Sequence, residues 1–226
     1  MKYQQLAILI PCHNEEENIV NAIEQALFYG QTFVIDNAST DQSYAKATTT
    51  NAIVIKETRL GYGNAIMTGM LEAKRRGFTI AIVLDADLSD NPSDIPILVE
   101  PILHENVDLC LSSRTRLEDQ VNLEAHQRFG NLLAVNLMRL KTGYRYRDMG
   151  PFRAFIIDKI LELQMADENF GWNIEMQLKA VIHRLSIREI ELPYRKRTIG
   201  TSKISGNLKN SLKAGAIILQ SVWKYS

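Results

Sequence analysis

The stretch that decides the fold is LAILIPCHNEEENIVNAIEQAL, residues 6–27. Residues 6–10 form an unbroken apolar run of strand length, and Pro11 is expected to end that strand. Apolar side chains then recur at helical spacing over residues 19–27. A buried strand followed directly by an amphipathic helix predicts the first half of a βαβ unit.

The start of that helix carries a local signal of its own. Asn14 is followed three residues later by Glu17, a spacing that resembles a capping box. In a capping box, the two side chains satisfy backbone N–H groups that have no partner within the helix. The pattern therefore predicts that the helix begins close to Asn14.

The alternation of strands and helices continues outward from this stretch. Further strands are predicted at residues 32–35, 52–55, 79–84 and 107–111. Between two of them, Gly61-Tyr62-Gly63 opens a helix whose apolar face comprises Ala65, Ile66, Gly69, Met70 and Ala73. Strands that alternate with helices predict an α/β fold with a mainly parallel sheet and right-handed crossovers.

The second half is organised differently. Its predicted elements are a helix at 127–141, an irregular segment at 147–154, a helix at 172–184, a strand at 186–192, a basic loop at 194–206 and an amphipathic segment at 208–225. No repeat or linker divides the chain, so one domain over residues 1–206 is expected. Residues 207–226 are expected to pack on that domain as a helix or to lie on a membrane surface.

Composition narrows the functional classes. The chain has 226 residues, 46% of them hydrophobic, which excludes a disordered chain and a small disulfide scaffold. Lys+Arg and Asp+Glu both number 26, but residues 1–100 hold 13 acidic and 7 basic side chains. The basic excess of the second half is either scatter on a solvated surface or a sign that it handles phosphates or an anionic surface. Nucleic acid is not an expected partner, because no binding motif is present.

The cellular setting follows from what the sequence lacks. Cys12 and Cys110 fit a reducing compartment, no apolar run approaches the ~20 residues that span a bilayer, and the amino terminus has no signal-peptide pattern. We therefore expect a cytoplasmic protein, with a peripheral position at the inner face of the membrane as the alternative.

Polar residues follow each predicted strand of the first half. Ligands of open parallel sheets bind beyond the carboxyl ends of the strands, so these residues are expected to line one rim. They are residues 11–15, 36–41, 59–64, 85–90 and 112–114.

The strongest of these signals is Asp85-Ala86-Asp87. Two carboxylates beside each other after a buried strand offer hard oxygen ligands to Mg²⁺ or Mn²⁺. The alternative is that these aspartates stabilise a turn or cap a helix. We prefer this interpretation for Asp90, because residues 89–92 resemble the start of a helix. The Asp-x-Asp segment does not match the nucleophile loop of an aspartyl-phosphate phosphatase in detail. Gly61-Tyr62-Gly63 does not match a dinucleotide-binding fingerprint, because Ile66 stands where that motif has its third glycine.

Four motifs occur together in a recognisable order and spacing. The sequence resembles the family 2 nucleotide-sugar glycosyltransferases of the GT-A type over roughly residues 5–206. The motifs are IPCHNEE at 10–16, VIDNASTD at 34–41, GYGNA at 61–65 and DADLS at 85–89. Two later segments resemble the branch that transfers mannose or glucose to dolichyl or polyprenyl phosphate: DMGPFR at 148–153 and RTIGTSK at 197–203.

The resemblance implies a GT-A (Rossmann-like) fold, with a mainly parallel sheet flanked by helices, and a set of binding residues. Pro11 and Glu15 would flank the nucleobase, and Asp36 would accept a hydrogen bond from a ring N–H. Asp87 would ligate the metal, and Asp85 would contact the metal or the ribose. Close backbone approach to the nucleoside is implied for Gly61, Gly63 and Asn64, although a tight turn and helix cap explain the glycines equally well. Candidates for the donor diphosphate or the acceptor phosphate are Arg114, Arg128, Arg197 and Lys203.

Three departures from the family pattern stand out. Asn37 replaces the usual second acidic residue, Ala38 replaces a common glycine, and Ser89 stands where some relatives have a metal-ligating amide. Asp36 is therefore expected to carry the base contact without a second carboxylate.

The acceptor decides whether a base is needed. The resemblance implies an inverting transfer from a nucleoside-diphosphate sugar, with UDP-glucose favoured and GDP-mannose next. A polyprenyl phosphate is already anionic, whereas a hydroxyl acceptor in cell-envelope polysaccharide synthesis requires a carboxylate to remove its proton. Asp148 is the candidate base and Glu175 the second choice, with a salt bridge from Asp148 to Arg147 or Arg153 as the alternative.

A non-catalytic nucleotide-sugar binding protein is the remaining hypothesis. A nucleotidyltransferase is disfavoured because residues 11–17 are acidic and contain no glycine.

Overall fold

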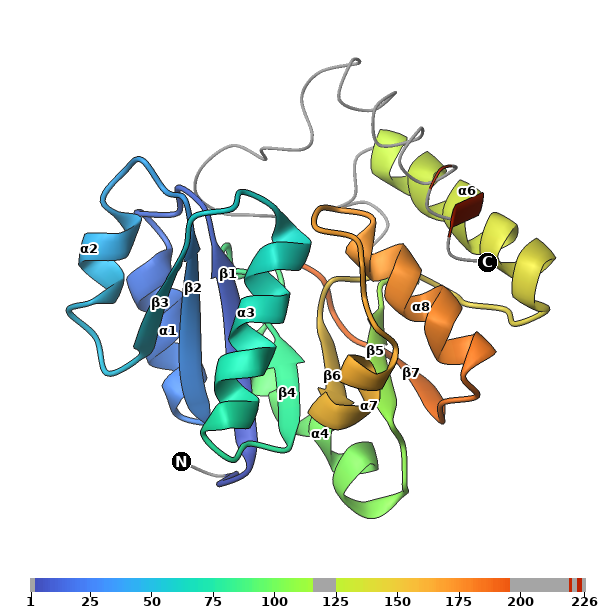
Figure 1. Cartoon of the computed structure of the whole chain (residues 1–226), viewed down its shortest axis with the longest axis horizontal. Helices are drawn as coiled ribbons and strands as arrows, with labels where there is room; N and C mark the ends of the chain where they lie inside the picture. Colours follow the sequence, from blue (N-terminus) through green and yellow to red (C-terminus); the bar gives the residue numbers. More distant parts are fainter. Residues whose placement is uncertain (1–2, 116–124, 196–219, 221–222, 225–226) are drawn as a thin grey trace.

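The computed structural model describes residues 3–115, 125–195, 220 and 223–224. Seven strands form one mixed sheet in the order β3-β2-β1-β4-β6-β5-β7 (Figure 1). The strands are β1 Leu6–Cys12, β2 Gln31–Asn37, β3 Ile53–Glu57, β4 Ile80–Val83, β5 Leu109–Ser113, β6 Arg153–Ile156 and β7 Ile187–Glu191. The helices are α1 Ile19–Leu27, α2 Ser43–Ala47, α3 Tyr62–Arg75, α4 Ile95–His104, α6 Ala125–Thr142, α7 Ile157–Glu162 and α8 Trp172–Ile182, and a 3-10 turn, Pro92–Asp94, precedes α4. The predicted α/β fold is confirmed.

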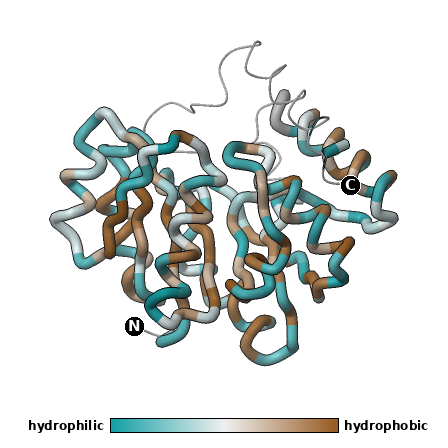
Figure 2. The backbone as a smooth tube through the Cα atoms, in the orientation of Figure 1, coloured by the Kyte–Doolittle hydropathy of each residue, from teal (hydrophilic) through white to brown (hydrophobic). Residues whose placement is uncertain are grey.

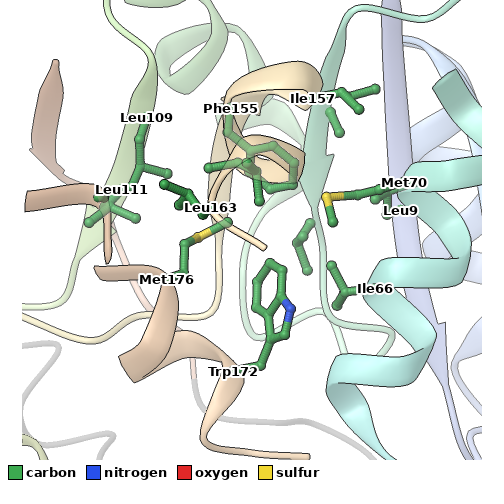
Figure 3. Packing of buried hydrophobic residues seen from close by; sticks show 14 of the residues in the cluster. Leu9, Ile66, Met70, Leu109, Leu111, Phe155, Ile157, Leu163, Trp172 and Met176 are labelled. Atoms are coloured by element: carbon green, nitrogen blue, oxygen red, sulfur yellow. The ribbon is translucent and has the colours of Figure 1, made fainter. Parts of the chain in front are cut away.

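Helices cover both faces of the sheet. Alternate residues of a strand point to opposite faces of the sheet. β1 therefore contributes side chains to the buried clusters on both faces, with Leu9 in one and Ile8 in the other. The first cluster includes residues of α3, α7 and α8, whereas the second includes residues of α1 and α4. Figure 3 shows Trp172 and Met176 of α8 facing Ile66 of α3 across the first cluster.

One strand was not predicted from the sequence. β6 runs antiparallel between β4 and β5, with Arg153 opposite Val83 on one side and Leu111 on the other. In the sequence, residues 147–154 contain Gly150-Pro151 and predict no strand. Its insertion makes the sheet mixed, while the remaining strand pairs are parallel.

Two boundary predictions near the amino terminus are wrong. Pro11 does not end β1, which continues to Cys12 opposite Asp36. Proline has no N–H to donate to a neighbouring strand. Pro11 loses no hydrogen bond to β4 for this reason, because β4 ends at Val83, opposite Leu9. The helix begins at Ile19 rather than near Asn14, so the capping box does not form.

Two predictions concern membranes and the carboxyl terminus. Within the described ranges, no helix combines the length and apolar character needed to cross a bilayer. Of the predicted 207–226 helix, the structure describes residues 220, 223 and 224, which are helical. The division at residue 206 therefore stays a prediction.

Candidate functional site

The carboxyl ends of β1 and β2 present a buried carboxylate. Asp36 lies opposite Cys12 in the parallel ladder and is almost fully buried. Its Oδ1 receives no hydrogen bond from a described residue. A buried acceptor without a donor is costly, so this oxygen is suited to an N–H group supplied by a ligand.

The loop that follows β1 is held by the loop that follows β2. Asn14 has a left-handed φ of 55°, its N–H donates to Ser39 Oγ at 3.0 Å, and its Oδ1 accepts the Thr40 N–H at 2.7 Å. The Glu15 N–H donates to Ser43 Oγ at 2.7 Å. These contacts join the loop that carries Glu15 to the loop after β2, while Pro11 lies one residue before Cys12, the ladder partner of Asp36.

Asn37 joins the ends of β2 and β3 to α3. Its Nδ2 donates to the Arg59 carbonyl at 2.8 Å, and its Oδ1 accepts the Gly61 N–H at 2.8 Å. An aspartate at this position would lack the donor, which explains the amide in place of the second acidic residue. Asn37 therefore builds the rim, a role that sequence reasoning missed.

The glycines that open α3 face another part of the chain. A Cβ atom on Gly63 would lie 2.1 Å from the Asp167 carbonyl oxygen, and one on Gly61 would lie 2.2 Å from that of Glu168. The Asn64 N–H donates to the same Glu168 oxygen at 3.1 Å. The close approach that requires glycine here is thus made by residues 167–168, and contact of these positions with a nucleoside stays a prediction.

The two carboxylates after β4 lie close together, as predicted. Burial and the neighbouring Asp87 carboxylate raise the pKa of Asp85 to about 7. Asp87 Oδ1 accepts hydrogen bonds from the Ser89 N–H and hydroxyl, and Leu88 between them adopts a left-handed φ of 59°. Repelling carboxylates of this kind fit a divalent cation, whose charge would remove the repulsion.

A metal at this pair would need further ligands. Among the described residues, no group of three or more His, Cys, Asp or Glu side chains is arranged to hold a metal ion. Mg²⁺ commonly binds to one or two carboxylates plus substrate phosphates and waters. The pair is therefore suited to a cation that arrives with a phosphate ligand.

Asp90 lies in the bend that precedes the 3-10 turn, as predicted, but it is not the residue that caps that turn. The helix-start role belongs to Asn91, whose side chain accepts the Ser93 N–H at 3.2 Å. Asp90 is instead buried, and its Oδ2 receives no hydrogen bond from any described group. Burial, followed by repulsion from Asp85, raises its pKa well above the ordinary carboxyl value.

Asp148 and Arg114 form a bidentate ion pair. Arg114 Nε donates to Asp148 Oδ2 at 2.8 Å and Nη2 donates to Oδ1 at 3.1 Å, while the Arg114 backbone N–H also reaches Oδ2 at 2.9 Å. The Asp148 side chain is 1% exposed. Burial opposes ionisation, but Arg114 outweighs it and lowers the pKa of Asp148.

This pairing corrects two predictions. Asp148 does not present a free carboxylate to a hydroxyl acceptor, and its partner is neither Arg147 nor Arg153. Glu175, the second choice, is fully buried and accepts the N–H groups of Ala166 and Asp167 at 2.8 and 2.7 Å. Asp148 positions Arg114, and Glu175 holds the loop that precedes α8.

Arg153, the last residue of the DMGPFR motif, is a second buried cation at the site. It is fully buried, forms no ion pair within the described residues, and donates to the carbonyls of Gly150 and Pro151. Burial lowers its pKa, while nearby Asp85 acts in the opposite direction. Its positive charge stabilises the carboxylate form of Asp85.

The basic loop begins beside the carboxylate pair. The Arg195 N–H donates to the Ser89 carbonyl at 2.9 Å, and the Arg114 guanidinium lies 5.0 Å from the centre of the Tyr194 ring. The chain thus returns from β7 to the turn that carries Asp87.

The comparisons with known proteins agree with this arrangement. A family model described as glycosyl transferase family 2 matches residues 7–161. An uncharacterized glycosyltransferase of Mycobacterium tuberculosis is 31% identical over 221 residues, covering 97% of this chain and 96% of its own. The chain belongs to glycosyl transferase family 2. As a member of a family of enzymes, it is a glycosyltransferase, and the hypothesis of a non-catalytic binding protein is set aside.

Other relatives are more distant. The undecaprenyl-phosphate mannosyltransferase of Micrococcus luteus is 27% identical and covers 88% of this chain and 87% of its own. The polyprenol monophosphomannose synthase of Mycolicibacterium smegmatis is 25% identical, covering 90% of this chain and 82% of its own. The solved glucosyl-3-phosphoglycerate synthase of M. tuberculosis, in complex with Mn²⁺, UDP and phosphoglyceric acid, has a TM-score of 0.72 at 20% identity and covers 96% of this chain and 78% of its own. That structure supports the GT-A fold.

For three predicted basic residues of this glycosyltransferase, the assignment to a phosphate is not tested by the described part of the chain. Arg128 is exposed near the start of α6 and pairs with no described carboxylate. Arg197 and Lys203 lie outside the described residues. Their assignment to a phosphate stays a prediction, whereas Arg114 lies with Asp90 and Asp148 at the rim.

Proposed function

We propose that this family 2 glycosyltransferase transfers a hexose from a nucleoside-diphosphate sugar to a polyprenyl phosphate. The observation that carries the proposal is the ion pair of Asp148 with Arg114. It commits the predicted base to a cation, and a phosphate acceptor needs no base because its oxygen is largely deprotonated near pH 7. The same ion pair fixes a guanidinium, which suits bidentate binding of a phosphate.

Donor binding follows from the carboxylates of the rim. Asp36 Oδ1, which is buried and has no donor among the described residues, would accept a ring N–H of the base. Asp87 and Asp85 would hold Mg²⁺ or Mn²⁺ against the diphosphate. When bound there, the cation would neutralise charge on the leaving group.

The transfer itself is an in-line displacement. An anionic oxygen of the acceptor phosphate attacks C1 of the hexose, and the bond from C1 to the diphosphate oxygen breaks, so that the electron pair leaves with the nucleoside diphosphate. The configuration at C1 inverts. Arg114, oriented by Asp148, stabilises negative charge on the acceptor phosphate, and the positive charge of Arg153 favours the ionised form of Asp85.

The names of the relatives support the acceptor class. Two of them are named for a polyprenol-linked phosphomannose product and for an undecaprenyl-phosphate acceptor. A neighbouring structure contains UDP and Mn²⁺. UDP-glucose is the first donor to test and GDP-mannose the second.

The test is identification of the product. The full chain is incubated with Mn²⁺, a short polyprenyl phosphate and each donor in turn, and the organic phase is analysed by mass spectrometry. We expect the acceptor to gain one hexosyl unit with one of the two donors and to gain none when EDTA is present. Transfer to free sugars or polyprenol, with none to the phosphate, would overturn the proposal in favour of a hydroxyl acceptor.

A further inference from the structure

Helix α6 has an unusual composition for a surface helix. Its 18 residues include no Asp or Glu, in a chain where acidic and basic side chains are equal in number. It carries Arg139 and Lys141 in its last turn and Arg128 near its start. The Lys and Arg residues of the helix therefore lie near its two ends, and no acidic side chain offsets their charge.

The outer face of α6 is apolar. Phe129, Leu132 and Leu140 are 68%, 59% and 82% exposed. At 3.6 residues per turn they fall within an arc of about 80°, opposite the buried Ala134 and Met138. The helix packs on α8 at the outside of the molecule, and hydrophobic segments interrupt the hydrophilic ones along it (Figures 1 and 2). This apolar stripe faces away from the protein core.

An exposed tryptophan lies at the carboxyl end of α6. Lys141 Nζ lies 4.1 Å from the centre of the Trp223 ring, and Trp223 is itself mostly exposed. Tryptophan and lysine together are typical of the level of lipid headgroups, where an aromatic ring meets acyl chains and a cation meets phosphate.

We propose that α6 docks on the surface of an anionic phospholipid bilayer, with Phe129, Leu132 and Leu140 inserted between the acyl chains. Charge complementarity selects this occupant. An apolar stripe with Arg128 and Arg139 along one side, on a helix that carries no carboxylate, matches a surface of negative headgroups. Self-association of two such faces would bring like charges together.

The docked helix lies next to the rim. Asn131 of α6 accepts the Met149 N–H at 2.9 Å, and the same N–H reaches Asp148 Oδ1 at 2.8 Å. Asp148 in turn holds Arg114. A bilayer on α6 is thereby adjacent to the cation assigned to the acceptor phosphate; this consequence rests on the proposed function, whereas the docking does not.

The first test is co-sedimentation of the full chain with vesicles of phosphatidylcholine alone or mixed with phosphatidylglycerol. We expect binding to the anionic vesicles that weakens as salt is added. The double substitution Leu132→Gln with Leu140→Gln should lower the partition coefficient at least about tenfold, since burial of each leucine favours binding by roughly that factor. The matched control is Phe28→Ser, which removes a side chain that is 74% exposed at the end of α1.

The outcomes separate the alternatives. Unchanged binding of the leucine variant, or an equal loss with Phe28→Ser, would overturn the proposal. A concentration-dependent dimer that the leucine substitutions abolish, without vesicle binding by the wild type, would also overturn it and make α6 an interface between two copies. Thermal denaturation of each variant checks that it is folded.

A second assay distinguishes docking from the proposed reaction. With a short polyprenyl phosphate in detergent, the leucine variant should keep the wild-type kcat/KM, whereas with the acceptor in vesicles its rate should fall about as much as its binding. Vesicle binding without any transfer to a phosphate would leave the docking intact and refute the proposed function. Equal loss of rate in detergent and in vesicles would contradict docking as the role of the stripe.

Discussion

Asp148→Asn is the substitution that separates a base from a positioning residue. The Asp148 carboxylate accepts hydrogen bonds from three N–H groups of Arg114 and from the N–H of Met149. The asparagine amide has the same shape, but an NH2 group, which donates, replaces one of the two accepting oxygens. Removing one partner of a buried ion pair costs about 3–5 kcal/mol. Because the Arg114 side chain retains 13% exposure, we expect about 3 kcal/mol. For a chain of this length, that lowers Tm by roughly 6–12 °C.

The kinetic effect of this substitution follows from the loss of Arg114 orientation. With polyprenyl phosphate as acceptor, KM for the acceptor should rise while the shape of the pH–rate profile is kept, because no proton is removed in the transfer. Arg114→Gln combined with Asp148→Asn should be no worse than Arg114→Gln alone, since both act on the same contact.

The assay measures Tm, KM and kcat for both single variants and the double variant across the neutral pH range. The reasoning would be refuted if Asp148→Asn left Tm and acceptor KM unchanged but lowered kcat by ~10²–10⁴-fold with loss of the acidic limb of the profile. That pattern is the one expected of a general base.

The remaining predictions concern three carboxylates. Asp87→Ala should abolish metal-dependent binding of the nucleoside diphosphate and change Tm little, since its Oδ1 accepts the N–H and hydroxyl of Ser89 two residues along the same turn. Calorimetry with and without EDTA checks it, and metal-dependent binding by the variant would contradict it. Asp36→Ala should weaken nucleotide binding about 10–150-fold, the effect of one hydrogen bond to a charged group, without loss of Tm, and an unchanged Kd would locate the base elsewhere. Hydrogen bonds from Arg59 outweigh burial and lower the pKa of Glu57 to about 2. The wild type should therefore be more stable than Glu57→Gln above the carboxyl pKa of the unfolded chain, and this difference in stability should shrink as the pH falls toward 2. An equal Tm difference at about pH 7 and about pH 3 would be inconsistent with this.

The first half of the fold could be predicted because its signals are local. Apolar runs and helical spacing in α3 depend on neighbours within a few residues, and all five residues predicted for its inner face are buried. The carboxyl ends of consecutive parallel strands necessarily meet, so the carboxylates Asp36, Asp85 and Asp87 could be assigned to one rim from their positions after strands.

The second half depended on contacts that the sequence does not encode locally. Asp148 pairs with Arg114, 34 residues earlier, rather than with the arginines beside it. Gly63 is required by the carbonyl of Asp167, which belongs to a loop before α8. β6 pairs antiparallel with two strands, and Arg153, its first residue, is fully buried. These features follow from tertiary packing, which overrides local patterns of polarity.

The central claim is that the acceptor supplies an anionic oxygen and the enzyme supplies no base. The most direct measurement compares kcat/KM for a polyprenyl phosphate and for the unphosphorylated polyprenol of the same chain length, with the same donor and Mn²⁺. We predict that the phosphate is preferred by at least ~10²-fold, because a hydroxyl would lack the proton acceptor that general base catalysis requires. Equal kcat/KM values, or a preference for the polyprenol, would contradict the claim.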